Sequence, residues 1–307
     1  MAGLKQIKSK IRSTEKTRKV TKAMEAVSAA KMRKAQNRAL SGRDYARAAV
    51  SILARVSGSR ELLSHPLAKR REPKRALYVV ITSDKGLAGA LNSSVLRRTY
   101  DDMSSYGDVK SVRIIAVGRK ANDFFSRRGY TVEAFHEHKE EVVSRELIES
   151  VVNEAADRFV AGQCDVVKIA YQNFISTFEQ RPTLRTVFPL SLEELSKVVG
   201  DIVPKRGAFA EQGSAVGSSS TNVITIEPSA EEVLGVILPK LAGIFVYHAL
   251  LESAACEHSA RMVAMKSASD KGQELQHALT LKFNKARQAA ITREVSEITG
   301  GLEAMDA

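Results

Sequence analysis

Proline and glycine are almost absent from the two ends of this chain of 307 residues. Residues 1–57 and residues 240–299 each contain no proline and only two glycines. Because these residue types interrupt helices, and because both stretches are rich in Ala, Lys, Arg, Glu and Met, each stretch predicts one long helix. At 1.5 Å per residue each helix is roughly 85–90 Å long, too long for a single compact domain to bury. The sequence therefore predicts an antiparallel coiled coil of the two terminal helices, with the residues between them forming a head.

Cysteine and long apolar runs are also scarce. Cys164 and Cys256 lie far apart and have no metal-ligand spacing, which is typical of a protein from a reducing compartment. No uninterrupted apolar run reaches 18 residues, so the sequence predicts no membrane-spanning helix. The start, MAGLKQIKSK, lacks the apolar segment of a signal peptide. It is basic and amphipathic, like a transit peptide, but its pattern continues into the predicted helix.

Catalytic motifs are missing from the middle of the chain, which has no G-x-S-x-G and no promising Cys–His pair. Ser83–Gly89 (SDKGLAG) places glycines and a lysine before a predicted helix, where anions bind. It matches neither the P-loop nor the dinucleotide-binding pattern, so a tight turn or a contact surface is the preferred interpretation. His136 and His138 lack a third ligand, and we interpret their segment as an exposed loop. We expect no catalytic residue, metal or cofactor.

The residues between the two rods predict an α/β domain with a largely parallel sheet. Strands are expected at 76–82, 112–117, 130–135, 165–171, 183–189 and 222–226, and helices at 90–106, 119–128 and 141–161. Residues 207–221 are rich in Gly and Ser and predict a loop. Ser229 and Glu232 have capping-box spacing, and Pro239 predicts a kink near the start of the second rod. The predicted boundaries are a shaft helix at 1–58, a Rossmann-like head at 74–200, a loop and last strand at 201–226, a shaft helix at 227–301 and a tail at 302–307.

Apolar and small residues in both rods predict the contact seam of a coiled coil. In the second rod the seam alternates steps of three and four, a period of 3.5. Its members are Leu241, Ile244, His248, Leu251, Ala255, His258, Met262 and Met265, then Leu279, Phe283, Ala286 and Ala290. In the first rod the predicted members are Leu4, Ile7, Ile11, Thr14, Thr17, Val20, Met24 and Val27. Three successive short steps from Ile11 to Val20 predict local overwinding. We interpret His248 and His258 as packing residues.

Positive charge is concentrated in the first rod. Residues 1–60 hold 16 Lys or Arg and three Asp or Glu, a net charge of +13, whereas the remaining residues sum to −1. A one-signed helix that lacks i,i+4 Glu–Lys compensation predicts an acidic partner: nucleic acid, anionic lipid or an acidic protein surface. The alternative is a solvated helix that Lys and Arg keep soluble. Tyr45 is the one aromatic residue of this rod, so the rod offers no stacking platform for single-stranded nucleic acid.

Four segments resemble the gamma subunit family of the F-type ATP synthases, in the same order along the whole chain. They are Ile11–Arg33, Ser83–Asn92 (SDKGLAGALN), Ser259–Lys266 and Phe283–Ile298. The resemblance implies that the terminal helices form the shaft of a rotary motor, inside a ring of three alpha and three beta subunits. It places the head beside the epsilon subunit and the ring of c subunits. Proton flow turns ring and shaft, and the shaft changes the nucleotide affinities of the beta subunits.

The resemblance also implies that catalysis belongs to the neighbouring subunits and that this chain is not an enzyme by itself. With no transit peptide recognised, the simplest expectation is a peripheral membrane protein on the cytoplasmic face of the bacterial plasma membrane, and a processed organelle protein is the alternative. Residues that match the family's contacts with alpha and beta are Met24, Arg261, Arg287, Gln288, Thr292 and Glu294. Met24 corresponds to a position that meets an acidic loop of beta. Residues on the side of epsilon and the c-ring are Ser83, Asp84, Lys85, Gly86, Leu87 and Asn92.

Two other classes of protein fit parts of the pattern. A basic helical rod on an α/β head is also expected of a nucleic-acid-binding protein, whose affinity falls steeply with salt. An α/β enzyme with helical arms is the third hypothesis, and activity of the isolated chain would support it.

Overall fold

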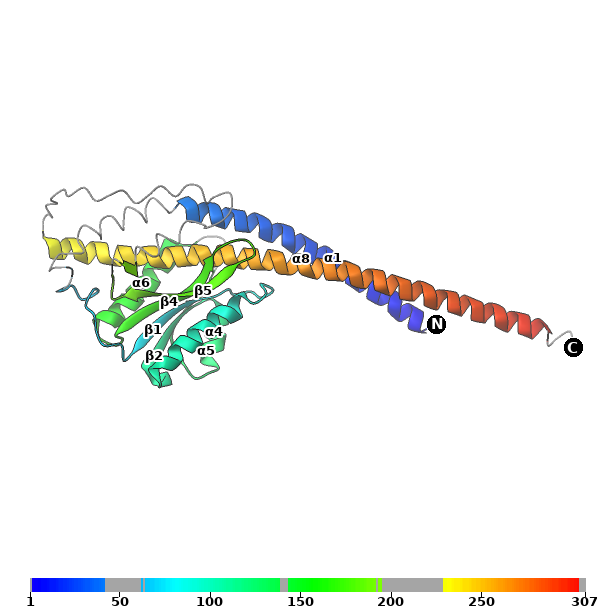
Figure 1. Ribbon diagram of the computed structural model, residues 1–307, viewed down its shortest axis with the longest axis horizontal. Helices are drawn as coiled ribbons and strands as arrows, with labels where there is room; N and C mark the ends of the chain where they lie inside the picture. Colours follow the sequence, from blue (N-terminus) through cyan, green and yellow to red (C-terminus); the bar gives the residue numbers. More distant parts are fainter. Residues whose placement is uncertain are drawn as a thin grey trace. The chain divides into compact units, whose positions relative to one another are not determined.

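The computed structural model describes residues 2–41, 62, 64–138, 143–191, 193–194 and 229–303. The chain forms two compact units, Met1–Ser28 with Arg261–Ala307, and Ala29–Ala260. The two long helices, α1 (Ala2–Ser41) and α8 (Ala230–Glu303), each contribute residues to both units. The prediction of a long helix at each end of an α/β region is confirmed (Figure 1). Pro239 lies inside α8 and does not end it, and residues 42–58 and 222–226 lie outside the described residues.

The unit of residues 29–260 contains a five-stranded sheet in the order β3-β2-β1-β4-β5. Its strands are β1 (Ala76–Ile81), β2 (Val112–Val117), β3 (Thr131–His136), β4 (Val166–Phe174) and β5 (Gln180–Phe188). The first four are parallel, and β5 pairs antiparallel with β4. The predicted parallel sheet is therefore confirmed. The hairpin of β4 and β5 is longer than expected, because its strands continue to Phe174 and begin at Gln180.

Helices cover both faces of this sheet, as Figure 1 shows. They are α4 (Leu91–Met103), α5 (Arg119–Ser126) and α6 (Arg145–Val160), with short 3-10 turns η1 (Ser104–Tyr106) and η2 (Val109–Ser111). All six residues of β1 are buried, as expected for a central strand. Leu77, Val79 and Ile81 pack with α6 and α8, whereas the alternate residues, such as Tyr78, pack with α4 and α5.

The first part of α8 is a core helix of this unit. Leu234, Leu238 and Phe245 are each no more than 2% exposed and belong to the core on the α6 face of the sheet. A window within Glu232–Thr299 has a mean hydropathy of 1.8, enough by length and composition to cross a membrane, but 56% of it is buried in the protein. The sequence analysis missed this window because Pro239 and Lys240 interrupt the apolar run. Burial against the sheet accounts for its apolar character.

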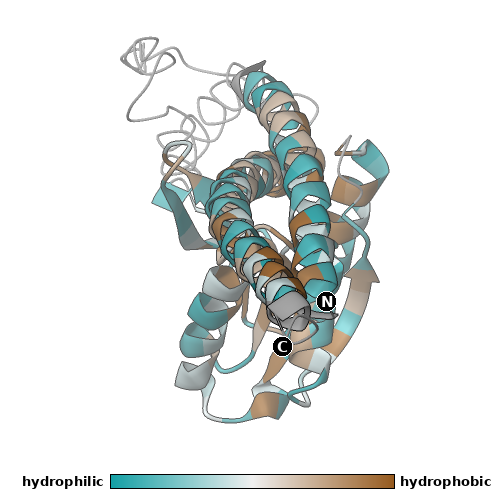
Figure 2. Cartoon of the chain, turned by 90° about the vertical axis from the view of Figure 1, so that its right-hand side faces the viewer, coloured by the Kyte–Doolittle hydropathy of each residue, from teal (hydrophilic) through white to brown (hydrophobic). Residues whose placement is uncertain are grey.

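Residues 2–28 of α1 and 261–303 of α8 form an antiparallel helix pair (Figures 1 and 2). The buried and half-buried positions of this part of α8 alternate steps of three and four through Met265, Leu279, Phe283, Ala286 and Ala290, as predicted, and include Ser269, Gly272 and Gln276. Figure 2 shows hydrophobic and hydrophilic residues alternating along both helices. The pair is therefore a polar, narrow coiled coil.

The predicted seam of α1 is wrong after Thr14. The inward positions continue with regular spacing through Arg18, Thr21, Glu25 and Ser28, all half-buried or buried. Val20 and Val27 are instead 58% and 56% exposed, and Thr17 is exposed. Arg18 packs beside Gly272 of α8, and a Cβ added to residue 272 would lie in ordinary van der Waals contact with the Arg18 Cβ, at 3.6 Å. The inward positions of α1 thus keep a period of 3.5. No overwound stretch is needed to explain the pairing.

Candidate functional site

Side chains fill the position where a sheet of this order usually binds a ligand, the carboxyl edge between β1 and β4. The Gln172 side chain donates from Nε2 to the carbonyl oxygen of Leu91 at 2.7 Å. Cys256 of α8 is fully buried against Ala88 and Leu91, and its Sγ donates to the carbonyl oxygen of Gln172 at 3.4 Å. The start of α4 is therefore covered by protein, and this edge has no room for a nucleotide.

The turn after β1 is held by its own polar side chains. Ser83, which is 1% exposed, donates its backbone N–H to Asn92 Oδ1 at 3.0 Å, and Asn92 Nδ2 donates to Ser83 Oγ at 2.8 Å. Asp84 Oδ1 accepts from the backbone N–H of Arg119 at 2.8 Å, which ties the turn to α5. Two of the predicted contact residues, Ser83 and Asn92, thus fix the turn rather than form its surface.

The surface of the same turn consists of Lys85, Gly86 and Leu87, all exposed. Leu87 is 63% exposed and has a φ of 63°, a left-handed conformation that costs a non-glycine residue free energy. The hydrogen bonds of Ser83 and Asn92 hold the backbone in this conformation. Leu87 is therefore presented to solvent on a rigid support, as a contact residue would be.

Four of the predicted shaft contacts lie on the outer surface of α8. Arg287, Gln288, Thr292 and Glu294 are all exposed. Met24 of α1 is half-buried, whereas Arg261 is 6% exposed and lies within the protein. The surface placement of the first four leaves them accessible to a partner, and the burial of Arg261 favours an internal role.

The last described turns of α8 carry an apolar stripe that the sequence analysis did not single out. Every described side chain from Ile291 to Thr299 is exposed, and Ile291, Val295 and Ile298 are 51%, 54% and 64% exposed. Their spacing of four and three puts them on one face of the helix. The apolar spacing of these three residues is visible in the sequence. It was not singled out because Ile291 lies one position beyond Ala290, the last residue of the predicted seam, and therefore on another face of the helix. A single helix with an uncovered apolar stripe is typical of a surface that a partner buries.

A second apolar strip lies on the outer face of α1, where Val20 and Val27 flank the half-buried Met24. Exposed lysines surround it, including Lys19 and Lys22. Two of them have local partners, with Nζ–Oε distances of 2.9 Å for Lys19–Glu15 and 3.2 Å for Lys22–Glu25. The sequence expectation of no local compensation is therefore wrong for these pairs, and Lys19 holds the pKa of Glu15 below its usual value. The rod keeps its excess positive charge.

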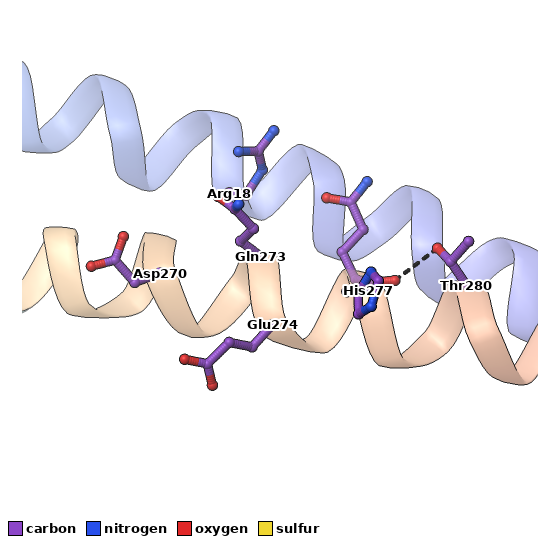
Figure 3. Close-up of a pocket in the computed structure, with 7 residues that line it drawn as sticks. Arg18, Asp270, Gln273, Glu274, His277 and Thr280 are labelled. Atoms are coloured by element: carbon purple, nitrogen blue, oxygen red, sulfur yellow. Dashed lines mark hydrogen bonds between the residues drawn. The ribbon is translucent and has the colours of Figure 1, made fainter.

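A polar groove of about 740 Å³ lies between α1 and α8 within the coiled coil (Figure 3). Its walls are Arg18 from α1 and, from α8, Asp270, Gln273, Glu274, Gln276, His277 and Thr280. The hydrogen bond drawn in Figure 3, from Thr280 Oγ1 to the carbonyl oxygen of Gln276 at 2.8 Å, stays within α8. The groove contains no activated nucleophile, and it shows that the two helices are not sealed by an apolar seam here.

Buried titratable groups of α8 lie beside β4 and β5, because Arg185 and the backbone of Phe174 both act on Glu252. His248 Nδ1 is 3.5 Å from Glu252 Oε1, and both side chains are almost fully buried. Burial raises the pKa of Glu252 well above its usual value, although the nearby Arg185 opposes the shift. His258 is 3% exposed, so the interpretation of both histidines as packing residues is confirmed.

The interpretation of the His136–His138 segment as an exposed loop is wrong for both histidines, since His136 is the half-buried last residue of β3 and His138 is buried. That side chain is 3% exposed, and its Nδ1 lies 4.0 Å from Oε2 of the buried Glu257 in α8. His136 Nε2 lies 3.3 Å from Glu154 Oε1 in α6. Neither contact has a local sequence signal, because both partners are distant in the chain. Among the described residues there is no group of three or more His, Cys, Asp or Glu suited to a metal ion.

Comparison with known proteins finds full-length relatives. A family model described as ATP synthase matches residues 3–305. The ATP synthase gamma chain of Pelotomaculum thermopropionicum is 38% identical over 306 residues, covering 100% of both chains. Those of Staphylococcus epidermidis and Heliobacterium modesticaldum are 37% and 36% identical, with at least 99% of each chain covered.

Two solved structures share the fold. The first, from the mitochondrial ATP synthase of Euglena gracilis, has a TM-score of 0.64 at 19% identity and covers 99% of this chain and 95% of its own. The second, from the central stalk and c-ring of the Tetrahymena thermophila enzyme, has a TM-score of 0.61 at 24% identity and covers 81% and 99%. The likeness therefore includes the long helices as well as the head.

Proposed function

The chain belongs to the ATP synthase gamma chain family, and we propose that it couples rotation of a c-subunit ring to ATP synthesis or hydrolysis at sites on other subunits. It is the central-stalk subunit of that enzyme, a rotor built from α1, α8 and the α/β head. Of the solved structures it resembles, one is described with F1 and a c-ring and the other with a central stalk and a c-ring. Family membership leaves the nucleic-acid-binding hypothesis without support. In this proposal the catalytic residues belong to the neighbouring subunits, and the described part of this chain has no group suited to a metal ion.

The uncovered stripe of Ile291, Val295 and Ile298 is the observation that best supports a rotor enclosed by a ring of other subunits, here called the sleeve. These residues lie on the last turns of α8, where all described side chains are exposed. A ring of three alpha and three beta subunits supplies a surrounding surface that buries such a stripe without a fixed partner. Arg287, Gln288, Thr292 and Glu294 on the same turns supply the polar contacts, made with loops of beta.

The strip of Val20, Met24 and Val27 on the outside of α1 meets the acidic loop of a beta subunit. Carboxylates of that loop face the surrounding lysines, and the apolar strip accepts its hydrophobic side chains. Exposed ion pairs contribute little free energy each, so the contact releases easily when the shaft turns. Arg261 acts indirectly, because its burial keeps it away from the stator.

The head contacts the epsilon subunit and the c-ring through the turn of Lys85, Gly86 and Leu87, which Ser83, Asp84 and Asn92 hold in shape. The complex is bound to a membrane through the c-ring, so this chain is a peripheral protein. The bacterial relatives support a position on the cytoplasmic face of the plasma membrane.

Purification of the complex from membranes in mild detergent tests this function. The tagged chain is expected to retain alpha, beta, epsilon and c subunits, and the complex to hydrolyse ATP while the isolated chain does not. Recovery of the chain with nucleic acid and without ATPase subunits would overturn the proposal.

A triple variant tests the sleeve. Replacement of Ile291, Val295 and Ile298 by Ser is expected to lower ATP-driven proton pumping severalfold, because the stripe no longer packs against the stator. The control replaces Val109, Val160 and Val236, which are exposed on the head, by Ser. Equal pumping by the two triple variants would show that the stripe has no role in the sleeve.

A further inference from the structure

Three aromatic side chains form a surface cluster on the head, outside every contact assigned above. Tyr100 of α4 meets Phe124 of α5 with ring centroids 6.4 Å apart, and meets Tyr130 with centroids 6.3 Å apart, in edge-to-face geometry. The fully buried Phe125 packs beneath, 5.0 Å from Phe124 and 5.7 Å from Tyr130. Tyr100 is 43% exposed, and Phe124 and Tyr130 are half-buried. The core therefore fixes the cluster while its outer edges face solvent.

Cations surround these rings. Arg97 lies one helical turn before Tyr100, and Arg127 and Arg128 follow α5. The Arg128 guanidinium lies 3.6 Å from the centroid of the Phe124 ring, and its Nη1 donates to the Phe124 carbonyl oxygen at 3.1 Å. Arg97 and Arg127 are exposed, and neither has an ion pair within the described part of the chain.

Nearby carboxylates neutralise only part of the charge of these arginines. Asp102 is held by Lys168 Nζ at 2.6 Å and by the Tyr78 hydroxyl at 2.5 Å. The exposed Asp101 and Asp123 lie four residues from Arg97 and Arg127, so they offset part of the positive charge. With Arg128, the arginines still outnumber these two carboxylates. The rim of the cluster is thus positively charged, which favours a negatively charged partner.

The two tyrosine hydroxyls add neutral donors. Burial, and then the neighbouring Tyr100, raise the pKa of Tyr130, while Arg128 acts in the opposite direction. This phenol therefore stays protonated at neutral pH and lies within electrostatic reach of Tyr100 and Arg128. Among the described residues neither hydroxyl makes a hydrogen bond. The two phenol O–H groups and the guanidinium N–H groups of Arg97 and Arg127 are hydrogen-bond donors. A carboxylate, whose oxygens only accept, is the group that matches them.

We propose that this cluster of Tyr100, Phe124 and Tyr130, with Arg97 and Arg127 at its rim, docks an acidic segment of another ATP synthase subunit. Carboxylates of the segment pair with the arginines and accept from the phenols, and a neighbouring apolar side chain packs on the ring edges. The ring faces are used by edge-to-face packing and by Arg128, so nucleic-acid bases have no face on which to stack. The proposal rests on the function above, since it requires the assembled enzyme.

The test is photocrosslinking in the purified complex with benzoylphenylalanine in place of Tyr100. The chain is first shown to co-purify with the other subunits, because failure at that step contradicts the proposed function rather than the docking surface. Mass spectrometry is expected to find an adduct with a peptide of another subunit that contains Asp or Glu beside an apolar residue. Adducts confined to the gamma chain itself, or to phospholipid, would overturn the proposal.

Charge reversal provides the control. The double variant Arg97→Glu, Arg127→Glu is expected to lower the crosslink yield about tenfold at low salt, and the wild-type yield is expected to fall as salt rises. Lys69→Glu, Arg70→Glu makes the same change in net charge at exposed positions before β1 and is expected to leave the yield unchanged. If the reversal destabilises the chain, Arg97→Gln, Arg127→Gln replaces it. An equal yield in both double variants would overturn the proposal.

Discussion

Gly118 lies directly against the backbone carbonyl of Thr82. Its φ is 97°, and a Cβ added to it would lie 2.1 Å from the Thr82 carbonyl oxygen, far inside van der Waals contact. Thr82 Oγ1 accepts from the backbone N–H of Ala121 at 2.9 Å, and its own N–H donates to the Val117 carbonyl oxygen at 2.8 Å. The ends of β1 and β2 and the start of α5 therefore meet with no space for a side chain at residue 118. The turn that presents Leu87 follows directly.

The first prediction is that Gly118→Ala lowers the free energy of unfolding by about 2–4 kcal/mol, since it combines a positive φ with a backbone clash. Gly129→Ala is the matched control, because Gly129 has a φ of 80° but no heavy atom within 4 Å of its added Cβ. The control is expected to cost only about 1 kcal/mol. Denaturant titration of both variants measures the difference, and equal losses would contradict the close contact.

A second prediction separates the observed seam of α1 from the one expected from sequence. Val20→Ser and Val27→Ser are each expected to change the thermal stability of the isolated chain by less than about 0.5 kcal/mol, because both side chains are exposed. Ile11→Ser, at a half-buried seam position, is expected to cost about 1–2 kcal/mol. A large loss of stability in Val20→Ser would mean that Val20 packs in the seam after all, as the sequence predicted.

The third prediction concerns pH. Burial raises the folded-state pKa of Glu252, so folding favours its neutral form. The unfolded chain ionises this group first, near its usual pKa of about 4.3, and stability falls as the pH rises from there toward the folded pKa. His248, Arg185 and Tyr171 face the group and limit the effect.

Glu252→Gln is expected to remove this slope. Between roughly pH 5 and 7 the wild type is expected to lose unfolding free energy as the pH rises, and the variant is not. The stability of the variant relative to wild type should therefore increase by at most about 1.4 kcal/mol per pH unit. Denaturation of both proteins across this range gives the measurement. A pH-independent difference would mean that Glu252 is ionised in the folded chain.

The fourth prediction tests the polar contacts of the shaft. Arg287→Ala with Gln288→Ala is expected to remove about 2–4 kcal/mol of stator contact, using typical charge-assisted hydrogen bonds, and to lower ATP turnover of the reconstituted complex. Lys34→Ala, at an exposed position of α1, is expected to do little. Subunit stoichiometry is measured alongside turnover. Normal turnover with full assembly in the double variant would exclude these contacts.

Sequence patterns predicted secondary structure correctly where consecutive or regularly spaced side chains are strongly buried. The apolar run of β1 predicted its strand because all six side chains are buried, and the small apolar residues of α8 predicted its seam. The seam of α1 was misplaced because Val20 and Val27 are more apolar than Arg18 and Thr21, the residues that face α8. In a polar helix pair the hydropathy of one helix does not settle which side chain points inward, because neighbours on the other helix, such as Gly272 beside Arg18, also take part.

The candidate contacts were less predictable from single residues. The family resemblance predicted Arg287 and Gln288 as contacts with other subunits, and both are exposed. It predicted the same role for Arg261, which is buried. His138 gave no local signal, because its partner Glu257 lies more than a hundred residues away in the sequence. The aromatic cluster of Tyr100, Phe124 and Tyr130 depends on three separate segments of the head, so only the fold brings it together.

Both native thiols are inaccessible, which has a practical consequence for fluorescence and rotation experiments. Cys164 is 1% exposed and Cys256 is 0% exposed, and burial raises the pKa of Cys164 to about 11. At neutral pH the thiolate, the form that reacts with maleimide dyes, is a very small fraction of such a group. A single cysteine introduced at an exposed position outside the proposed contacts, such as Lys110, would therefore be the one accessible thiol of this chain for a dye or a bead. The two native cysteines of this chain then need no replacement before rotation is followed.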